Sequence, residues 1–205
     1  AIPRRGAINL HASLLPDYRG AAPINHAVIN GETKSGVTTF FINEDIDTGN
    51  IIFQEECEIL PEDNAGSLHD KLMTIGANLV VKTVDSIAEG NIKTIPQETI
   101  SNRKLNPAPK ITKEYCRIDF NDNAETIHNK IRGLSPYPAA WVTIPNSDDT
   151  FKVFESSFET EPHDLPTGTF VSDNKSYLKV AAKDGFVFIT DLQIAGKKRM
   201  KVRDL

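Results

Sequence analysis

Asn9 and His11 are two polar side chains, two residues apart, that alternate with the apolar residues Ile8 and Leu10. In a β-strand this spacing places both polar side chains on one face and both apolar side chains on the other. An amide that donates and accepts hydrogen bonds, beside an imidazole, suits a carbonyl oxygen that becomes an oxyanion. Taken alone, the two residues fit either a catalytic pair or hydrogen-bonded structural side chains.

Asp47 is the candidate acidic partner. It lies in the segment 43–49, between the β-rich runs 36–42 and 50–54, and Thr48 and Gly49 follow it. An acid in such a tight connection can point into a cleft, or it can accept a hydrogen bond from its own backbone as a turn former. The sequence alone leaves both roles open.

The elements that hold these residues follow from the hydrophobic pattern. β-branched and aromatic residues predict strands over 7–10, 37–42 and 51–59, and helical spacing predicts helices over 23–30 and 66–89. The strand over 7–10 is expected to be buried. Ser13 and Pro16 end it, so Asn9 and His11 lie near its carboxyl end, where open α/β sheets bind ligands.

The composition changes after residue 100. Residues 101–110 contain two prolines and no aromatic residue, which is typical of a stiffened linker. A short helix around 123–132 and short strands over 151–154, 168–171, 177–181 and 186–194 predict a small antiparallel barrel. We therefore expect three parts: 1–100, a basic linker over 101–114, and 115–205.

Composition and charge narrow the class of protein. Of the 205 residues, 39% are hydrophobic and 25% charged, which is ordinary for a globular protein, and no apolar run is long enough to span a bilayer. We expect no membrane partner. Cys57 and Cys116 lack the spacing of metal ligands and are expected to be free thiols in a reducing compartment, which suits a cytoplasmic location. No metal is expected.

Five motifs in order carry a resemblance. Together they resemble the folate-dependent formyltransferase superfamily and, within it, the methionyl-tRNA formyltransferases. The motifs are Asn9–Pro16, Tyr18–Ile24, Gly36–Thr38 with Ile46–Gly49, Arg132–Trp141 and Gly196–Met200. Members of this family carry a further upstream segment, so we expect the chain to lack the N-terminal part of its catalytic domain. The implied fold is α/β: the C-terminal half of a Rossmann-like formyltransferase domain (1–100), the linker, and an OB-like β-barrel that binds tRNA (115–205).

The resemblance also implies an activity. A formyl group passes from 10-formyltetrahydrofolate to the α-amino group of methionyl initiator tRNA, for translation initiation. Asn9 donates a hydrogen bond to the developing oxyanion, His11 stabilises or protonates it, and Asp47 orients His11 or relays the proton lost by the amine. The folate lies against Ser13, Leu14, Leu15 and Pro16, and the full-length protein is expected to be a monomer.

Basic residues are the candidate tRNA contacts. Residues 1–100 carry 7 Lys and Arg against 14 Asp and Glu, whereas residues 101–114 carry 4 against 1. Phosphate contacts by Lys and Arg position a nucleic acid without reading its sequence. The expected contacts are Arg103, Lys104 and Lys110 of the linker with Lys197, Lys198 and Arg199. Trp141 could stack on a base, but we expect it to anchor the core of the small domain.

Three alternatives remain open. A nucleotide-sugar formyltransferase would share Asn9, His11 and Asp47 but needs no barrel that grips tRNA. Glycinamide ribonucleotide formyltransferase shares the same three residues but ends with the catalytic domain, which residues 115–205 argue against. A nucleic-acid-binding fragment without activity as truncated is the third alternative, and it leaves the arrangement of Asn9, His11 and Asp47 unexplained.

Overall fold

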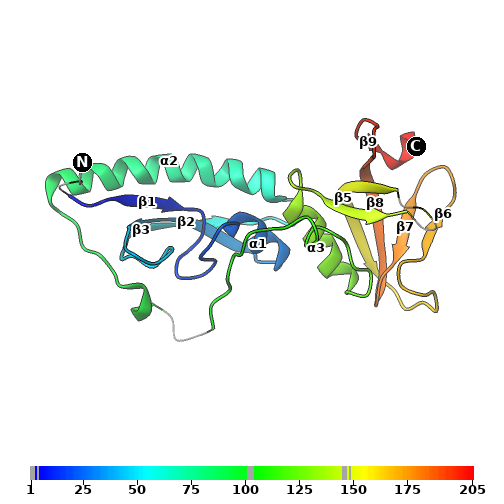
Figure 1. Cartoon of the computed structure of the whole chain (residues 1–205), viewed down its shortest axis with the longest axis horizontal. Helices are drawn as coiled ribbons and strands as arrows, with labels where there is room; N and C mark the ends of the chain where they lie inside the picture. Colours follow the sequence, from blue (N-terminus) through cyan, green and yellow to red (C-terminus); the bar gives the residue numbers. More distant parts are fainter. Residues whose placement is uncertain (1–2, 4, 101–103, 145–146, 148) are drawn as a thin grey trace. The chain divides into compact units, whose positions relative to one another are not determined.

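The structure, a computed structural model, describes residues 3, 5–100, 104–144, 147 and 149–205. Two compact units make up the chain. The first contains the residues up to Ala27, Glu32–Asp63 and Ser67–Lys110, and the second contains Val28–Gly31, Asn64–Gly66 and Ile111–Leu205. The division falls within the helices α1 (Pro23–Ile29) and α2 (Ala65–Glu89), which are labelled in Figure 1. The described segment 104–110 of the predicted linker packs with the first unit.

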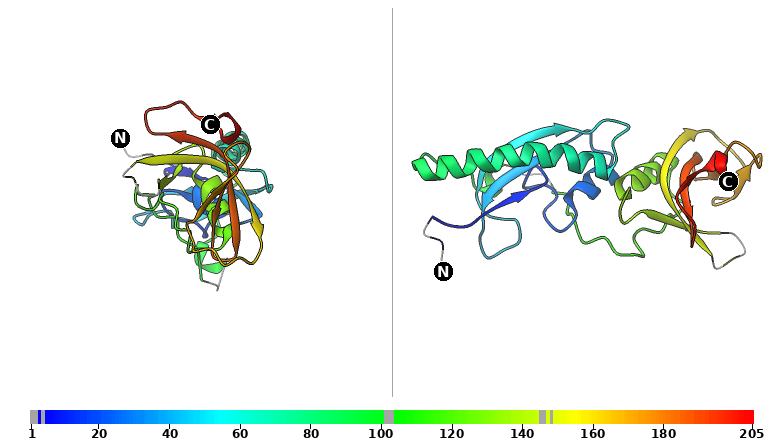
Figure 2. Two further views of the ribbon diagram at one scale, coloured as in Figure 1. Left: turned by 90° about the vertical axis from the view of Figure 1, so that its right-hand side faces the viewer. Right: turned by 90° about the horizontal axis from the view of Figure 1, so that it is seen from above.

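The first unit is built on an antiparallel sheet with the strand order β1–β2–β3. The strands are β1 (Ile8–His11), β2 (Lys34–Phe41) and β3 (Ile51–Glu58). Helix α2 lies along one face of this sheet, as the two views of Figures 1 and 2 show. A hydrogen bond of 2.9 Å between the hydroxyls of Thr39 on β2 and Thr83 on α2 joins the two layers. The three strands and the long helix confirm the predicted elements.

The opposite face of β2 holds the loop that follows β1. Leu15 from this loop forms a buried cluster with Phe40 and Ile51. Gly36 allows this close packing, because a Cβ there would lie 2.3 Å from the carbonyl oxygen of Glu55 and 2.5 Å from Leu14 Cδ2. The central strand is therefore covered on both faces, which fixes the start of the loop relative to the sheet.

Strand β1 differs from its predicted burial. Within the described residues it pairs with β2 alone, so it forms an edge of the sheet. Ile8 is half-buried and Leu10 is 36% exposed, so the prediction of a buried strand over 7–10 is wrong. The predicted position of His11 is confirmed, because it is the last residue of β1 and is buried.

The second unit consists of α3 (Ala124–Leu134) on an antiparallel sheet. Its six strands are β4 (Ala140–Thr143), β5 (Thr150–Thr160), β6 (Phe170–Ser172), β7 (Leu178–Ala181), β8 (Gly185–Ile194) and β9 (Met200–Lys201). The order is β4–β5–β8–β7–β6, with β9 beside β8. Ile127, Ile131 and Leu134 of α3 pack with residues of β5 and β8 in one core.

Closure of this sheet was predicted but is not confirmed. Pairing among the described strands leaves β4 and β6 at the two ends of an open order. The antiparallel arrangement and the helix are as predicted, and the sheet is not a closed barrel. A sequence pattern of short strands and turns predicts which neighbouring strands pair. Whether the sheet closes into a barrel depends on the twist of the sheet and the stagger of its strands.

Among the described residues, no helix is long and apolar enough to cross a membrane.

Candidate active site

His11 is fixed by a backbone carbonyl. Its Nε2 lies 2.8 Å from the oxygen of Tyr18, and the ring is only 6% exposed. A carbonyl oxygen accepts but never donates, so Nε2 carries a proton and donates it to Tyr18. Nδ1 is therefore the nitrogen without a proton in the neutral ring.

Asp47 approaches that second nitrogen. Its Oδ2 lies 3.6 Å from Nδ1 of His11, and it also accepts a 3.0 Å hydrogen bond from the backbone N–H of Gly20. Asp47 adopts a positive φ of 55°, in a loop between β2 and β3. At this distance the carboxylate acts on His11 as a nearby charge rather than through a direct hydrogen bond. The ring is oriented by Tyr18, and the carboxylate of Asp47 faces Nδ1.

The loop that carries Tyr18 and Gly20 is held by the segment after residue 104. The N–H of Tyr18 donates to the carbonyl of Asn106 at 2.7 Å, and the N–H of Ala108 donates to the carbonyl of Arg19 at 2.8 Å. A Cβ at Gly20 would lie 2.4 Å from the oxygen of Ala108, and its φ is 123°, so this position requires glycine. The described linker segment 104–110 is therefore part of the scaffold of the site.

Gln97 is a site residue that the sequence analysis missed. It is 1% exposed, and its amide nitrogen donates to the carbonyls of Asp47 at 2.9 Å and Gly49 at 2.8 Å. Its amide oxygen accepts from Arg19 Nε at 3.0 Å and Nη2 at 2.6 Å. One amide thus joins the Asp47 loop to the Arg19 loop. Its position in the 3-10 turn Gln97–Thr99, about fifty residues after Asp47, gave no pattern that pointed to it.

Asn9 shares the strand with His11 but not its burial. The two residues alternate with Leu10 on β1, and the side chain of Asn9 is exposed while His11 is buried. The exposed amide of Asn9 is accessible to a ligand. Its role as an oxyanion donor remains a prediction.

The predicted folate loop is largely internal. Ser13 and Leu15 are at most 1% exposed, Pro16 is also buried, and Leu14 is half-buried. The Ser13 hydroxyl donates to the Asp17 carbonyl at 2.6 Å, and the N–H of Leu15 donates to the Thr38 hydroxyl at 3.1 Å. The loop is therefore a rigid support whose polar groups are satisfied inside the protein. Contact with folate remains a prediction for these four residues.

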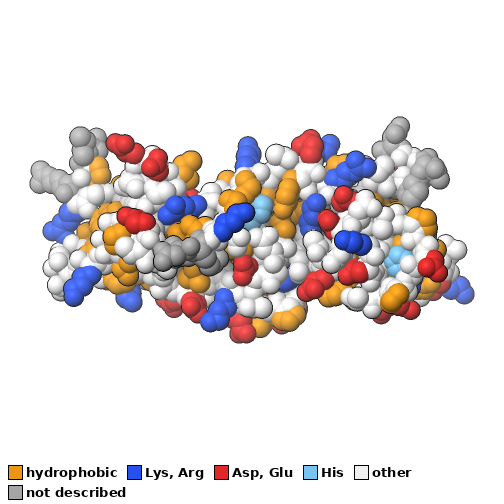
Figure 3. Space-filling model, turned by 90° about the horizontal axis from the view of Figure 1, so that it is seen from below, with side chains coloured by type: hydrophobic (Ala, Val, Ile, Leu, Met, Phe, Trp, Pro, Cys, Tyr) orange, Lys and Arg blue, Asp and Glu red, His pale blue; other side chains and the backbone are white. Residues whose placement is uncertain are grey.

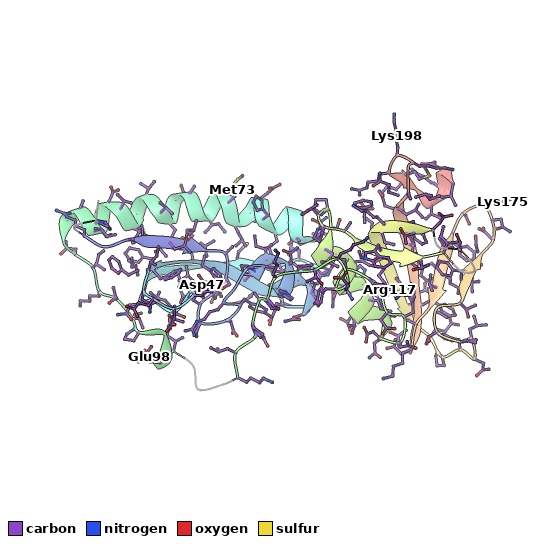
Figure 4. All side chains as sticks on the ribbon, in the orientation of Figure 1. Asp47, Met73, Glu98, Arg117, Lys175 and Lys198 are labelled. Carbon is purple, nitrogen blue, oxygen red and sulfur yellow. The ribbon has the colours of Figure 1, made fainter. Side chains whose placement is uncertain are left out.

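The predicted nucleic-acid contacts are not alike. Lys104 and Lys110 are exposed in the first unit, and Arg103 lies outside the described residues. Lys197 and Lys198 are exposed in the turn between β8 and β9, where Lys198 projects from the tip (Figure 4). Arg199 instead donates to Asp191 at 2.7 Å and to Glu155 at 3.4 Å, and its guanidinium lies 4.4 Å from the ring centroid of Phe154. Arg199 therefore has structural partners of its own.

Two family models match nearly the whole chain. The model described as formyl transferase matches residues 1–84, and the one described as formyl transferase, C-terminal domain, matches residues 110–205. The first match ends at residue 84 and the second begins at residue 110, so most of the linker segment that supports the loop after His11 lies between the two matches.

Curated relatives agree with the family models. The methionyl-tRNA formyltransferase of Bacteroides fragilis is 52% identical over 208 residues, which cover 100% of this chain and 64% of the relative. That of Flavobacterium johnsoniae is 48% identical over 206 residues, again 64% of the relative. The chain thus spans about two thirds of the length of these relatives.

Solved structures show the same fold. The sugar 3N-formyl transferase WlaRD, crystallised in the presence of dTDP and 5-N-formyl-THF, is 27% identical with a TM-score of 0.68, covering 93% of this chain and 66% of WlaRD. HypX from Aquifex aeolicus, in complex with tetrahydrofolic acid, is 21% identical with a TM-score of 0.68, covering 95% of this chain and 33% of HypX. The chain belongs to the formyl transferase family.

Proposed function

We propose that the protein carrying this chain transfers a formyl group from 10-formyltetrahydrofolate to the α-amino group of methionyl initiator tRNA, for translation initiation. The observation that carries the proposal is the placement of His11 Nδ1 beside the Asp47 carboxylate, 3.6 Å away. The relatives that share about half of the sequence are methionyl-tRNA formyltransferases, and they favour the tRNA acceptor over an amino sugar.

His11 and Asn9 have complementary tasks in this reaction. When the amine attacks the formyl carbon, the carbonyl oxygen gains negative charge. His11 is anchored through Nε2, so Nδ1 takes up the proton lost by the amine and then donates to that oxygen, and the exposed amide of Asn9 supplies a second donor. Each such donor contributes about 2.7–4 kcal/mol to lowering a barrier of this kind.

In this mechanism Asp47 assists the transfer of the proton that the amine loses. The amine loses a proton when its nitrogen bonds to the formyl carbon, and the departing folate nitrogen gains one. A carboxylate next to His11 Nδ1 stabilises the imidazolium that holds a proton between these two events. The hydrogen bond from the Gly20 N–H keeps Oδ2 of Asp47 at that position.

The loop after β1 is the proposed apolar support for the folate. Of the four predicted residues, Leu14 is half-buried, whereas Ser13, Leu15 and Pro16 are buried. Since the polar groups described for Ser13 and Leu15 are already bonded, the loop offers the flat pterin an apolar surface rather than hydrogen bonds.

The exposed lysines are the proposed tRNA contacts. Lys104 and Lys110 belong to the first unit, and Lys197 and Lys198 to the second. Basic and acidic side chains are interspersed on the surface shown in Figure 3, and the net charge is −5, so affinity for RNA must come from local groups of cations. Arg199 contributes less in this proposal, because its guanidinium is bonded to Asp191.

The finer architecture is part of the same proposal. The first unit corresponds to the C-terminal half of a Rossmann-like catalytic domain, and the second to an OB-like domain whose antiparallel sheet is open in the order described. We place the protein in the cytoplasm as a monomer, because its proposed substrates and free thiols belong there.

The test is formyl transfer by the full-length protein that carries this chain. His11→Ala and Asp47→Ala are expected to lower kcat by about 100-fold or more, because each removes a group that acts on developing charge. The exposed pair His69 and Asp70, with 3.1 Å between Nδ1 and Oδ1, is the matched control. His69→Ala and Asp70→Ala should leave kcat unchanged.

The acceptor decides between the alternatives. Transfer to methionyl-tRNA that requires His11 supports the proposal. Transfer to an amino-sugar nucleotide in place of the tRNA would retain the site and replace the substrate. No formyl transfer to either acceptor would leave a nucleic-acid-binding protein as the better interpretation.

A further inference from the structure

A row of three residues on the outer face of the second unit places an aromatic ring between two cations. On β4, Ala140 and Val142 point into the core, whereas Trp141 is only partly buried. Trp141 pairs with Lys152 on β5 and, on its other side, forms a bridge with Arg117. Side chains that lie opposite each other in a sheet share a face, so Arg117, Trp141 and Lys152 lie abreast on the outside. The expectation that Trp141 only anchors the core is therefore incomplete.

The ring of Trp141 is fixed and its polar group is satisfied. The indole N–H donates to the carbonyl of Lys113 at 2.9 Å. The guanidinium carbon of Arg117 (labelled in Figure 4) lies 5.7 Å from the ring centroid. With the N–H occupied, the ring can offer a ligand the part of its π surface that the core and Arg117 leave uncovered.

A cavity of about 550 Å³ opens beside this ring. The residues that line it include Tyr137, which is 82% exposed, Trp141, Lys113 and Lys152. Among the described residues that line it there is no carboxylate. Two aromatic rings with two cations and no acid match a ligand that is both flat and anionic.

We propose that this cavity binds an unpaired nucleotide of an RNA. The base stacks on Trp141 and Tyr137, and the phosphate lies against Lys113 and Lys152. Bases stack on aromatic side chains irrespective of sequence, and lysines neutralise the backbone. The inference rests on the proposed function only for the source of the RNA, the tRNA acceptor, since binding requires no catalysis.

A second cavity adjoins the first and could hold the neighbouring nucleotides of the same RNA strand. It has a volume of about 280 Å³, shares Thr150 and Lys152 with the first, and extends to Gly196. Gly196 directly precedes the exposed Lys197 and Lys198. A single strand whose base enters the cavity thus has further cations for its neighbouring phosphates.

The experiment uses the fluorescence of Trp141, which is the only tryptophan in the chain. A short unpaired oligoribonucleotide is titrated into the protein, and saturable quenching of the tryptophan emission is expected because the base stacks on the indole. Tyr137→Ala should weaken this binding by about 10-fold or more. Lys113→Ala and Lys152→Ala should each reduce the dependence of the binding constant on salt.

The controls separate stacking from charge and from misfolding. Tyr177→Ala and Lys175→Ala make the same changes at residues outside the cavity and should leave quenching unaltered. Tyr137 is too exposed to support the core, so its loss does not unfold the unit. AMP is titrated in parallel: binding by AMP as tight as by the oligonucleotide would assign the site to a free nucleotide, which supports the same chemistry.

Other outcomes overturn the inference. Absence of quenching by both RNA and AMP, equal binding of an RNA duplex, or equal binding of polyglutamate would show that no base stacks in the cavity. Binding that is as tight in Tyr137→Ala as in the unchanged protein would do the same. Failure of formyl transfer with intact quenching would reject the proposed function while the nucleotide site stands.

Discussion

At the scale of single residues, the site depends on hydrogen-bond donors and acceptors that the backbone supplies. The Tyr18 carbonyl assigns the proton on His11 Nε2, and the Gly20 N–H places Oδ2 of Asp47. In a Ser-His-Asp triad a carboxylate orients the imidazole, whereas here a carbonyl does so. The carboxylate of Asp47 is thereby left beside Nδ1, the nitrogen to which we assign the proton transfer.

Gln97 is the residue whose substitution tests this arrangement. In Gln97→Glu the carboxylate still accepts from Arg19, but it cannot donate to the carbonyls of Asp47 and Gly49. The Asp47 loop then loses its anchor, and we expect kcat for formyl transfer to fall by about 10- to 100-fold. The KM values should change less, since Gln97 is buried and so is shielded from direct contact with a substrate.

Gln193→Glu is the matched control, because its amide donates to a carbonyl in the second unit at 2.8 Å. A wild-type kcat in Gln97→Glu would show that the anchor is dispensable. A loss of the folded state instead of kcat would show that Gln97 serves stability alone.

At the scale of elements, the hairpin of β8 and β9 is held by an ion-pair network. Asp191 on β8 accepts from Arg199 at 2.7 Å and pairs with Lys201 at 3.1 Å. Burial by itself would raise the pKa of Asp191, but the hydrogen bonds from Arg199 and Lys201 outweigh it and hold the pKa below its usual value. The network therefore stabilises the folded unit through the ionised carboxylate.

Stability should consequently depend on pH through Asp191. Because its folded pKa lies below the unfolded value of about 3.9, the contribution is complete above that value and is lost as the pH falls through the folded pKa. Arg199→Ala should lower the free energy of unfolding at pH 7 by about 1–3 kcal/mol, a range reduced by the partial exposure of Arg199. Urea unfolding between pH 7 and about pH 2 measures both effects.

Lys183→Ala, at an exposed position of the same unit, serves as the control and should change neither value. If Arg199→Ala loses as much stability at the lowest pH as at pH 7, the ionised form of Asp191 is not what the network stabilises.

At the scale of the whole molecule, local cations must overcome an acidic background. The chain has a net charge of −5, and residues 1–100 contain twice as many acidic as basic residues. The proposed RNA binding should therefore depend on the exposed lysines more than on the overall field.

The turn lysines provide the corresponding prediction. The double substitution Lys197→Ala and Lys198→Ala should weaken tRNA binding and reduce the salt slope of the binding constant by about 1 to 2, without a change in unfolding free energy. Filter binding across a range of salt concentrations measures this slope. Arg199→Ala should reduce the slope less, because Arg199 is already paired with carboxylates. An equal reduction in slope for both variants would contradict this difference.

The sequence by itself determined the elements and the family. Period-two and helical patterns located β2, β3, α2 and α3 to within a few residues, because each pattern is set by which side chains face a core. Ordered motifs determined the resemblance, and they named His11 and Asp47, which the structure brings within 3.6 Å of each other.

Only the tertiary structure decided which groups hold these residues in place. Gln97, Tyr18 and Ala108 support the site through contacts with distant backbone groups, and such contacts leave no periodic trace in a sequence. The exposure of β1, the burial of Leu15 and the outward position of Trp141 likewise depend on which element covers which face. Local patterns fix which residues can pair, whereas the partner each residue has is set by packing across the chain.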